Sequence, residues 1–125
     1  MKALILSVLL SLTATPVYAN TVTGQFMLVS ERFWRDGDRC EGIRGYSDIN
    51  SGTPIIVRDE NNNIIANGEL GIGILEDRVT CVYPIIAFEL PKAKYYQFEI
   101  GKRDITYSRE QLLKNGFKLE LFLGG

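Results

Sequence analysis

The stretch that decides the fold runs from Cys40 to Cys81 and reads CEGIRGYSDINSGTPIIVRDENNNIIANGELGIGILEDRVTC. Its ends are the only two cysteines of the chain; Cys40 follows a polar, charged run, and Cys81 lies in the apolar run VTCVY at 79–83. We therefore expect a disulfide that ties a loop to a strand, clamps the two halves of a sheet protein and stabilises it by roughly 4 kcal/mol. A redox-active or metal-binding pair is disfavoured, because the cysteines lie far apart and the chain has no histidine.

The first residues predict a secretory signal peptide at 1–19 that is cleaved. Met1-Lys2 is a short positive start, the apolar run at 3–12 is too short to span a bilayer, and Val17-Tyr18-Ala19 resembles a signal-peptidase site. We expect the mature chain to begin near Asn20 and to be secreted or periplasmic. Because no cysteine lies at the junction, we expect no membrane anchor after cleavage. An oxidising compartment also suits the disulfide.

The remaining residues, 20–125, are enough for a single domain with one core. Without Lys2 the chain has 13 basic and 15 acidic residues, a formal charge of -2, and both signs are interspersed. Such a balance argues against nucleic acid and against an anionic membrane surface as partners. We expect a monomer.

Short alternating apolar segments separated by turn residues predict a β protein. The expected strands are 21–29, 53–59, 64–70, 79–90, 95–101 and 117–121. The side chains expected to face inward are Val22, Phe26 and Leu28 in the first strand, Tyr96, Phe98 and Ile100 in the fifth, and Phe117, Leu119 and Leu121 in the last. An asparagine-rich turn should join 53–59 and 64–70 in a hairpin. Pro84 predicts a bulge or bend within 79–90, which is expected to pair with 95–101 through the turn at 91–94.

One short helix is expected just after Ser108, since Ser108 and Gln111 have the spacing of a capping box and Asn115-Gly116 would end the helix. Several short strands with one brief helix predict an all-β fold. We expect an antiparallel Greek-key β-sandwich with one short helical crossover, stapled by one disulfide; a small barrel is the alternative.

Several segments also carry a family resemblance: CEGIRGYSDI at 40–49, GT at 52–53, VRD at 57–59, CVY at 81–83, LP at 90–91, and YS at 107–108 with QL at 111–112. In these the chain resembles a family of small bacterial extracytoplasmic β domains, found in secreted proteins and lipoproteins, whose function is not settled. The resemblance implies a disulfide-linked β domain and no catalytic residue. The chain departs from the pattern at Arg44, where relatives often have glycine, and at Asn63, where a turn glycine is common.

The residue types in the chain disfavour catalysis. Without histidine, serine and cysteine nucleophiles lack their usual base. A glycosidase pair of carboxylates is the remaining candidate, either Glu41 with Asp48 or Asp36 with Asp38. The acidic residues of 36–50 and 59–63 offer oxygen ligands that calcium prefers, but without EF-hand spacing and, in the first loop, with interleaved arginines. We expect these residues to serve turns, and expect neither enzyme activity nor a cofactor or metal.

The long connection at 31–49 is the candidate binding loop, with Phe33, Trp34, Arg35 and Arg39 as candidate contact residues. Two adjacent aromatics in an extended loop cannot both point inward, so we expect one to be exposed. Trp with Arg is the composition of an interface hot spot. The alternative, which packing favours, is that Trp34 caps one end of the core. Tyr46 and Tyr83 are expected to pack on the disulfide.

These observations lead to a functional hypothesis. We expect a secreted, non-catalytic domain that binds an extracytoplasmic protein or glycan through the 31–49 loop, with Trp34 as the anchor. The alternative is a proteinaceous inhibitor of a secreted envelope hydrolase such as lysozyme, which would insert a rigid loop near the disulfide into the enzyme's cleft.

Overall fold

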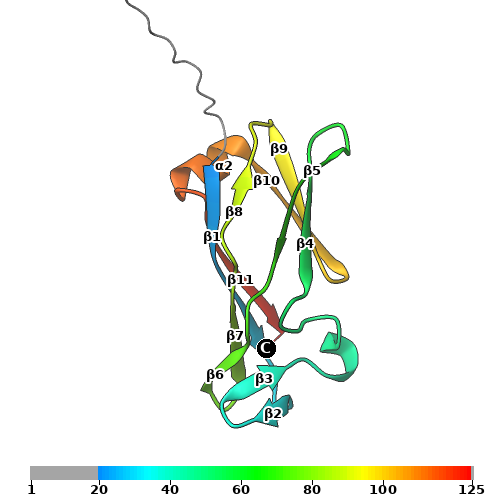
Figure 1. Ribbon diagram of the computed structural model, residues 1–125, viewed down its shortest axis with the longest axis vertical. Helices are drawn as coiled ribbons and strands as arrows, with labels where there is room; N and C mark the ends of the chain where they lie inside the picture. Colours follow the sequence, from blue (N-terminus) through cyan, green and yellow to red (C-terminus); the bar gives the residue numbers. More distant parts are fainter. Residues whose placement is uncertain (1–19, 125) are drawn as a thin grey trace, which may run out of the picture.

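The computed structural model describes residues 20–124, so the expected signal peptide at 1–19 lies outside the described residues. In chain order the elements are β1 (Asn20–Val29), β2 (Trp34–Asp36), β3 (Arg39–Glu41), the 3-10 helix η3 (Arg44–Tyr46), β4 (Pro54–Arg58), β5 (Ile64–Glu69), β6 (Ile74–Asp77), β7 (Thr80–Pro84), β8 (Phe88–Leu90), β9 (Tyr95–Ile100), β10 (Arg103–Ser108), α2 (Arg109–Lys114) and β11 (Lys118–Gly124). Figure 1 shows how they are arranged. Within this part of the chain, no helix has the length and apolar character that a membrane span needs.

The strands form two sheets that face each other, which confirms the expected all-β sandwich. The smaller sheet has the order β10-β9-β4-β5, and the larger has the order β11-β1-β7-β6-β3-β2, with β8 paired to the first part of β1. After the β4–β5 hairpin the chain passes through β6, β7 and β8 in the other sheet before β9 returns beside β4. This long return is the Greek-key connection.

Helix α2 is the expected helical crossover, because it carries the chain from β10 in the smaller sheet to β11 in the larger one. The capping box is confirmed: the Gln111 N–H donates to Ser108 Oγ at 3.1 Å, and the Ser108 N–H donates to Gln111 Oε1 at 2.7 Å. The crossover makes β11 parallel to β1, whereas the other strand pairs of the described chain are antiparallel.

The core lies between the sheets and is built from alternate residues of the strands, as period-two patterning requires. In β9 the inward residues are Tyr96, Phe98 and Ile100, and all three are buried as expected. Other strands contribute Val22, Phe26, Leu28, Ile55, Val57, Leu119 and Leu121. The sequence pattern therefore identified most of the inward faces correctly.

The prediction for 79–90 was partly wrong. An irregularity is present at Pro84, but instead of a bulge or bend within one strand it divides the segment into two strands, β7 and β8, which both pair with β1. The segment at 95–101 is β9, which pairs with β4 and β10 and not with 79–90. The turn at 91–94 therefore connects the two sheets instead of closing a hairpin.

Four strands lie in segments where the sequence pattern predicts none. Residues 71–77 contain β6, which forms a hairpin with β7. The long connection contains the β2–β3 hairpin and the 3-10 helix η3. Strand β10 pairs with β9 along its whole length.

The disulfide between Cys40 and Cys81 is present, with the two Cα atoms 6.0 Å apart. It joins β3 to β7, which lie on either side of β6, so both cysteines belong to the larger sheet. The expectation that it clamps the two halves of the protein was therefore wrong: it fastens the outer hairpin to the interior of one sheet. A Cβ at Gly73 would lie 2.8 Å from Cys81 Sγ and 2.6 Å from a carbon of the Tyr83 ring, so the disulfide and Tyr83 pack where a side chain is missing.

The first prediction concerns this disulfide. The double substitution Cys40→Ala with Cys81→Ala should lower the free energy of unfolding by about 2–4 kcal/mol, because the unfolded chain gains the entropy of an open loop. Urea denaturation followed by circular dichroism measures the change. Wild-type protein treated with dithiothreitol is the control and should show the same loss; an unchanged unfolding midpoint in both would contradict the prediction.

The second prediction concerns Arg44, which has a φ of 56°. This left-handed conformation costs a residue with a Cβ about 1–2 kcal/mol, whereas glycine adopts it freely but loses more entropy on folding. Arg44→Gly should therefore raise the free energy of unfolding by up to about 1 kcal/mol. Arg32→Gly, at a position without a positive φ, is the matched control and should not stabilise the protein.

Candidate interaction site

The β2–β3 hairpin forms the outer edge of the larger sheet and projects from the sandwich (Figure 1). Its register pairs Trp34 with Glu41 and Asp36 with Arg39. Two backbone hydrogen bonds join β3 to the β6 segment: the Cys40 N–H donates to the Gly73 carbonyl at 3.0 Å, and the Leu75 N–H donates to the Asp38 carbonyl at 2.7 Å. With the disulfide, these bonds hold the hairpin in place.

The two adjacent aromatic residues point in opposite directions, as expected. Phe33 is only 8% exposed and belongs to the core, whereas Trp34 is 47% exposed. The favoured prediction that Trp34 caps the core was therefore wrong, because Phe33 occupies that position. Sequence alone could not decide between the two, since both are large aromatics and the alternation tells only that they differ.

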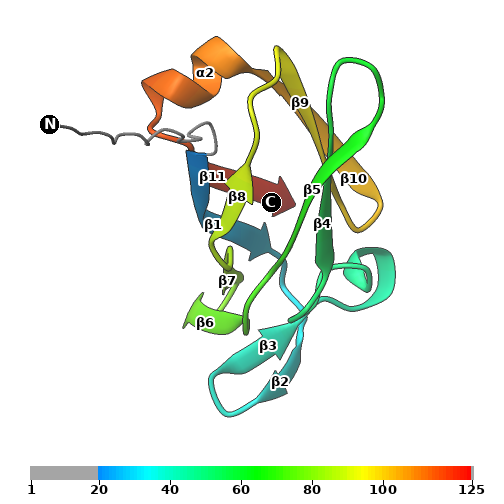
Figure 2. The same cartoon turned by 45° about the horizontal axis from the view of Figure 1, so that its top comes forward.

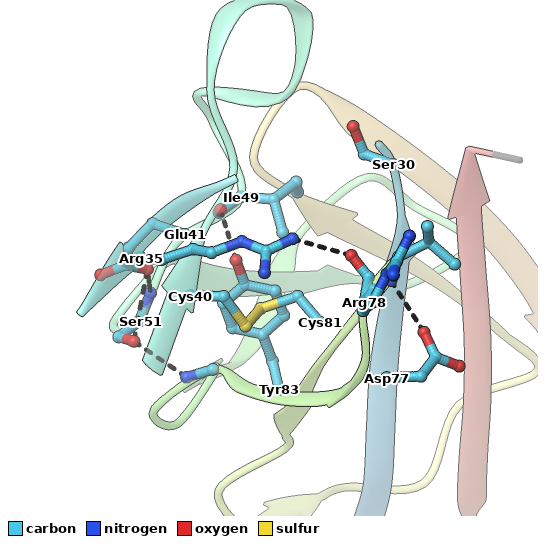
Figure 3. Close-up of a disulfide and its surroundings, with 12 residues drawn as sticks. Ser30, Arg35, Cys40, Glu41, Ile49, Ser51, Asp77, Arg78, Cys81 and Tyr83 are labelled. Atoms are coloured by element: carbon cyan, nitrogen blue, oxygen red, sulfur yellow. Dashed lines mark hydrogen bonds between the residues drawn. A yellow bond between two sulfur atoms is a disulfide. The ribbon is translucent and has the colours of Figure 1, made fainter. Parts of the chain in front are cut away.

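Arg35 is used to position the hairpin. Its guanidinium lies 5.9 Å from the centre of the Phe33 ring, and Nη2 donates to the Arg78 carbonyl at 2.8 Å (Figure 3). This bond joins β2 to the turn between β6 and β7. Of the four candidate contact residues, Phe33 is therefore buried and Arg35 is engaged within the molecule, while Trp34 and Arg39 are exposed.

Trp34, Asp36, Arg39, Glu41 and Ile74 share one side of the sheet, and we call these five residues the hairpin face. Directly paired residues on antiparallel strands point to the same side, as do residues two apart along a strand. Trp34 pairs with Glu41, two residues from Arg39, and Arg39 pairs with both Asp36 and Ile74. Ile74 is itself exposed, so the face combines two apolar side chains with one arginine and two carboxylates, of which Glu41 accepts a hydrogen bond from the Ser51 N–H.

Ile74 was not among the predicted contact residues, because the glycines at 71 and 73 favour a connection over a strand in this segment. The alternation Gly71-Ile72-Gly73-Ile74 is a signal that could have found it. Glycine at alternate positions leaves isoleucine on one side of an extended chain, and Gly73 is required because the disulfide fills the other side.

The acidic candidates for catalysis or calcium bind backbone amides. Glu41 Oε1 accepts from the Ser51 N–H at 2.7 Å, and Asp59 Oδ1 accepts from the N–H groups of Asn61 and Asn63 at 2.9 and 3.0 Å. Asp48 accepts from the Lys102 N–H at 2.9 Å. Asp59 therefore serves a turn, as expected, whereas Glu41 and Asp48 bind amides that lie 10 and 54 residues away and so join separate segments. In residues 20–124 no cluster of three or more cysteine, aspartate or glutamate side chains could hold a metal ion.

Asp48 joins the loop before β4 to the β9–β10 turn. Its Oδ1 lies 3.2 Å from Arg103 Nη2, which also donates to the Gly45 carbonyl, and the Arg103 guanidinium stacks on Tyr46. Burial raises the pKa of Asp48, but hydrogen bonds from backbone N–H groups, with the charges of Arg103 and Lys102, outweigh burial and lower the pKa below its ordinary value of 3.8. The ionised carboxylate is thus a structural link.

The third prediction follows from this link. A carboxylate with a depressed pKa in the folded state stabilises the protein above the unfolded value, and the stabilisation is lost as the pH falls through the folded value. Asp48→Asn should lower the free energy of unfolding at pH 7 by about 1–3 kcal/mol and flatten its decline below pH 3.8. Denaturation curves at several pH values measure both effects, and Asp104→Asn, an exposed carboxylate in β10, is the matched control.

A hollow of about 430 Å³ lies beside α2, at the end of the molecule opposite the hairpin, and is lined in part by Glu60, Lys94 and Arg109. Two of its polar groups bind within the molecule: Glu60 Oε1 accepts from the Lys94 backbone N–H at 3.0 Å, and Arg109 donates to the hydroxyl of Tyr96 at 2.8 Å.

No protein-family model, no curated protein and no solved structure matches this chain. The resemblance to small bacterial extracytoplasmic domains therefore stays a prediction. What the chain can bind has to be argued from its own geometry.

Proposed function

We propose that this protein is an extracytoplasmic, non-catalytic binding domain and that the hairpin face contacts another protein. The observation that carries the proposal is the exposure of Trp34 on a hairpin that is fixed on its inner side. A large aromatic that faces solvent loses the stabilisation it would gain by burial, about 2–3 kcal/mol for a side chain of this kind. Burial against a partner would recover it.

The fixed backbone supports the proposal. The Cys40–Cys81 bond and the Arg35 hydrogen bond hold both strands of the hairpin, so little conformational freedom is lost on association. Binding loops placed on rigid scaffolds use the same principle. A hairpin whose only purpose was to cover the core would not need an exposed tryptophan at its edge.

The composition of the hairpin face favours a protein partner over a glycan. Trp and Arg are enriched at interface hot spots, and Ile74, which is paired with Arg39, adds a second apolar side chain to the face. Arg39 and Asp36 at the rim would set the orientation of a partner by their opposite charges. Glycan binding through stacking on Trp34 is the other outcome that the experiment distinguishes.

The extracytoplasmic location rests on chemistry of the same region. A disulfide persists in an oxidising compartment, whereas cytoplasmic thiols are kept reduced. The apolar run at the start of the sequence fits export. Non-catalytic action is supported by the engagement of Glu41, Asp48 and Asp59 with backbone amides.

Inhibition of an envelope hydrolase such as lysozyme is the second candidate, and the projecting hairpin favours it. The hairpin is narrow, lies at one end of the molecule and is fastened by the disulfide, the form that insertion into an enzyme cleft requires (Figure 1). Slowing of a purified envelope hydrolase at stoichiometric protein would support this candidate; full activity at tenfold excess would dismiss it.

The fourth prediction tests the hairpin face. Trp34→Ala should weaken binding of an extracytoplasmic protein partner at least about 30-fold, since a hot-spot residue is worth 2 kcal/mol or more. Wild type, Trp34→Ala and Tyr95→Ala are compared by capture from the periplasmic or culture fraction and then by titration with the captured protein. Tyr95 is an equally exposed aromatic in the smaller sheet and serves as the matched control.

The outcome that contradicts the proposal is equal capture by wild type and Trp34→Ala, with circular dichroism showing that both are folded. Retention of wild type, but not of Trp34→Ala, on a glycan array, with no protein captured, would replace the protein partner by a glycan.

A further inference from the structure

The two sheets are joined along one side of the sandwich and separate along the other. On the joined side, Leu70 at the end of β5 forms a bridge with Ile85, and the Ile86 N–H donates to the Glu69 carbonyl at 3.1 Å. The strands β10, β9, β4, β5, β8, β1 and β11 therefore follow one another almost as a barrel (Figure 2). Within residues 20–124, β11 and β10 end this series and do not pair with each other. We call the space between these two strands the seam.

The seam contains two hollows that both strands line. One, of about 200 Å³, lies between Ile105 of β10 and Leu121 of β11. The other, of about 350 Å³, is lined by Tyr107 of β10 and by Lys118, Leu119 and Glu120 of β11. The two hollows thus follow the length of β11. The first reaches core side chains of the sandwich, including Phe26 and Phe98.

Within the described residues, the edge of β11 that faces the seam carries backbone groups without a strand partner. The Thr23 N–H donates to the Phe117 carbonyl at 3.2 Å, so this carbonyl, just before β11, faces β1. Backbone groups alternate sides along a strand, so those of Glu120 and Phe122 face the seam. The Phe122 side chain is also 70% exposed, the largest value among the large apolar residues of the described chain.

We propose that the seam binds an extended segment of a partner protein, which adds a strand to the edge of β11. Main-chain hydrogen bonds to Glu120 and Phe122 would provide affinity, and alternate side chains of the added strand would fill the two hollows. The site involves neither the hairpin face nor its partner. A test of the seam is therefore independent of the function proposed above.

Charge complementarity defines the segment. The outward residues of β11 are Lys118, Glu120 and Phe122, and neither of the two charged residues makes an ion pair within the described chain. Opposite charges facing each other across a strand pair are favourable and like charges are unfavourable. The segment therefore carries an acidic residue opposite Lys118, a basic residue opposite Glu120, an aromatic residue opposite Phe122, and apolar residues at the positions between.

A second copy of this chain fits the seam less well. Its own β11 has Leu119 and Leu121 buried in its own core, at 2% and 7% exposure, so these side chains cannot enter the hollows of another molecule. Two copies could meet only edge to edge. In the antiparallel register that pairs all seven residues of β11, Glu120 would face Phe122 of the other copy, and no charge would be matched.

The fifth prediction uses two synthetic peptides with blocked ends. The probe Thr-Val-Tyr-Val-Lys-Val-Glu, placed antiparallel to β11, puts glutamate opposite Lys118 and lysine opposite Glu120. The control Thr-Val-Tyr-Val-Glu-Val-Lys has the same composition with the charges exchanged. In an NMR titration of the full-length protein, the probe should bind about three- to tenfold more tightly than the control. The amides of Glu120 and Phe122 should shift and become protected from hydrogen exchange.

Two variants complete the test. The double substitution Lys118→Glu with Glu120→Lys keeps the composition of β11 and should reverse the preference between the peptides. Glu120→Pro removes an edge N–H that does not pair with β1, and should abolish binding while circular dichroism shows the fold retained.

Equal affinity for the two peptides, unchanged preference in the exchanged variant, or shifts confined to residues away from β11 would each overturn the proposal. A concentration-dependent dimer of the free protein in sedimentation, abolished by Glu120→Pro, would also overturn it by assigning the edge to a second copy.

Discussion

The structure depends on the backbone pairing of β1, which is hydrogen-bonded on both of its edges. Along one edge it pairs first with β8 and then with β7, and along the other it pairs with β11. The approach to β11 is so close at Gly24 that a Cβ there would lie 1.9 Å from the Leu119 carbonyl oxygen. Glycine at this position allows the ten-residue strand β1 to pair with β11 on one edge while it pairs with β7 and β8 on the other.

The larger sheet ends in two edges of different character. At one end, the disulfide and the Arg35 contact hold the β2–β3 hairpin against the sheet. There the buried Phe33 contributes to the core, whereas the exposed Trp34 is available to a partner. At the other end, α2 leads the chain into β11, whose outer edge has no strand partner among residues 20–124. Exposed strand edges are liabilities unless they are short, charged or covered. The hairpin is short, whereas β11 has seven residues and two charged side chains.

Local patterns carried most of what could be predicted from the sequence. Alternation identified the inward residues of β1, β9 and β11, the Ser108–Gln111 spacing identified the helix start, and Pro84 identified an irregularity in its strand. The strand partners were predicted correctly only for the β4–β5 hairpin, whose turn is local. Strands β7 and β8 pair with β1, which lies more than fifty residues away in the chain. Alternation of apolar residues does not indicate which distant strand will form the hydrogen bonds.

The sequence by itself determined the class of fold, the pairing of its two cysteines and the existence of one exposed aromatic in the long loop, because these depend on composition and on the period of a strand. Only the tertiary structure decided that Trp34, and not Phe33, is the exposed one, that the disulfide lies within a single sheet, and that Ile74 joins the hairpin face. It also decided that β10 and β11 face each other across hollows. The physical reason is that inward and outward are defined only when sheets pack, and packing is set by contacts between residues far apart in the chain.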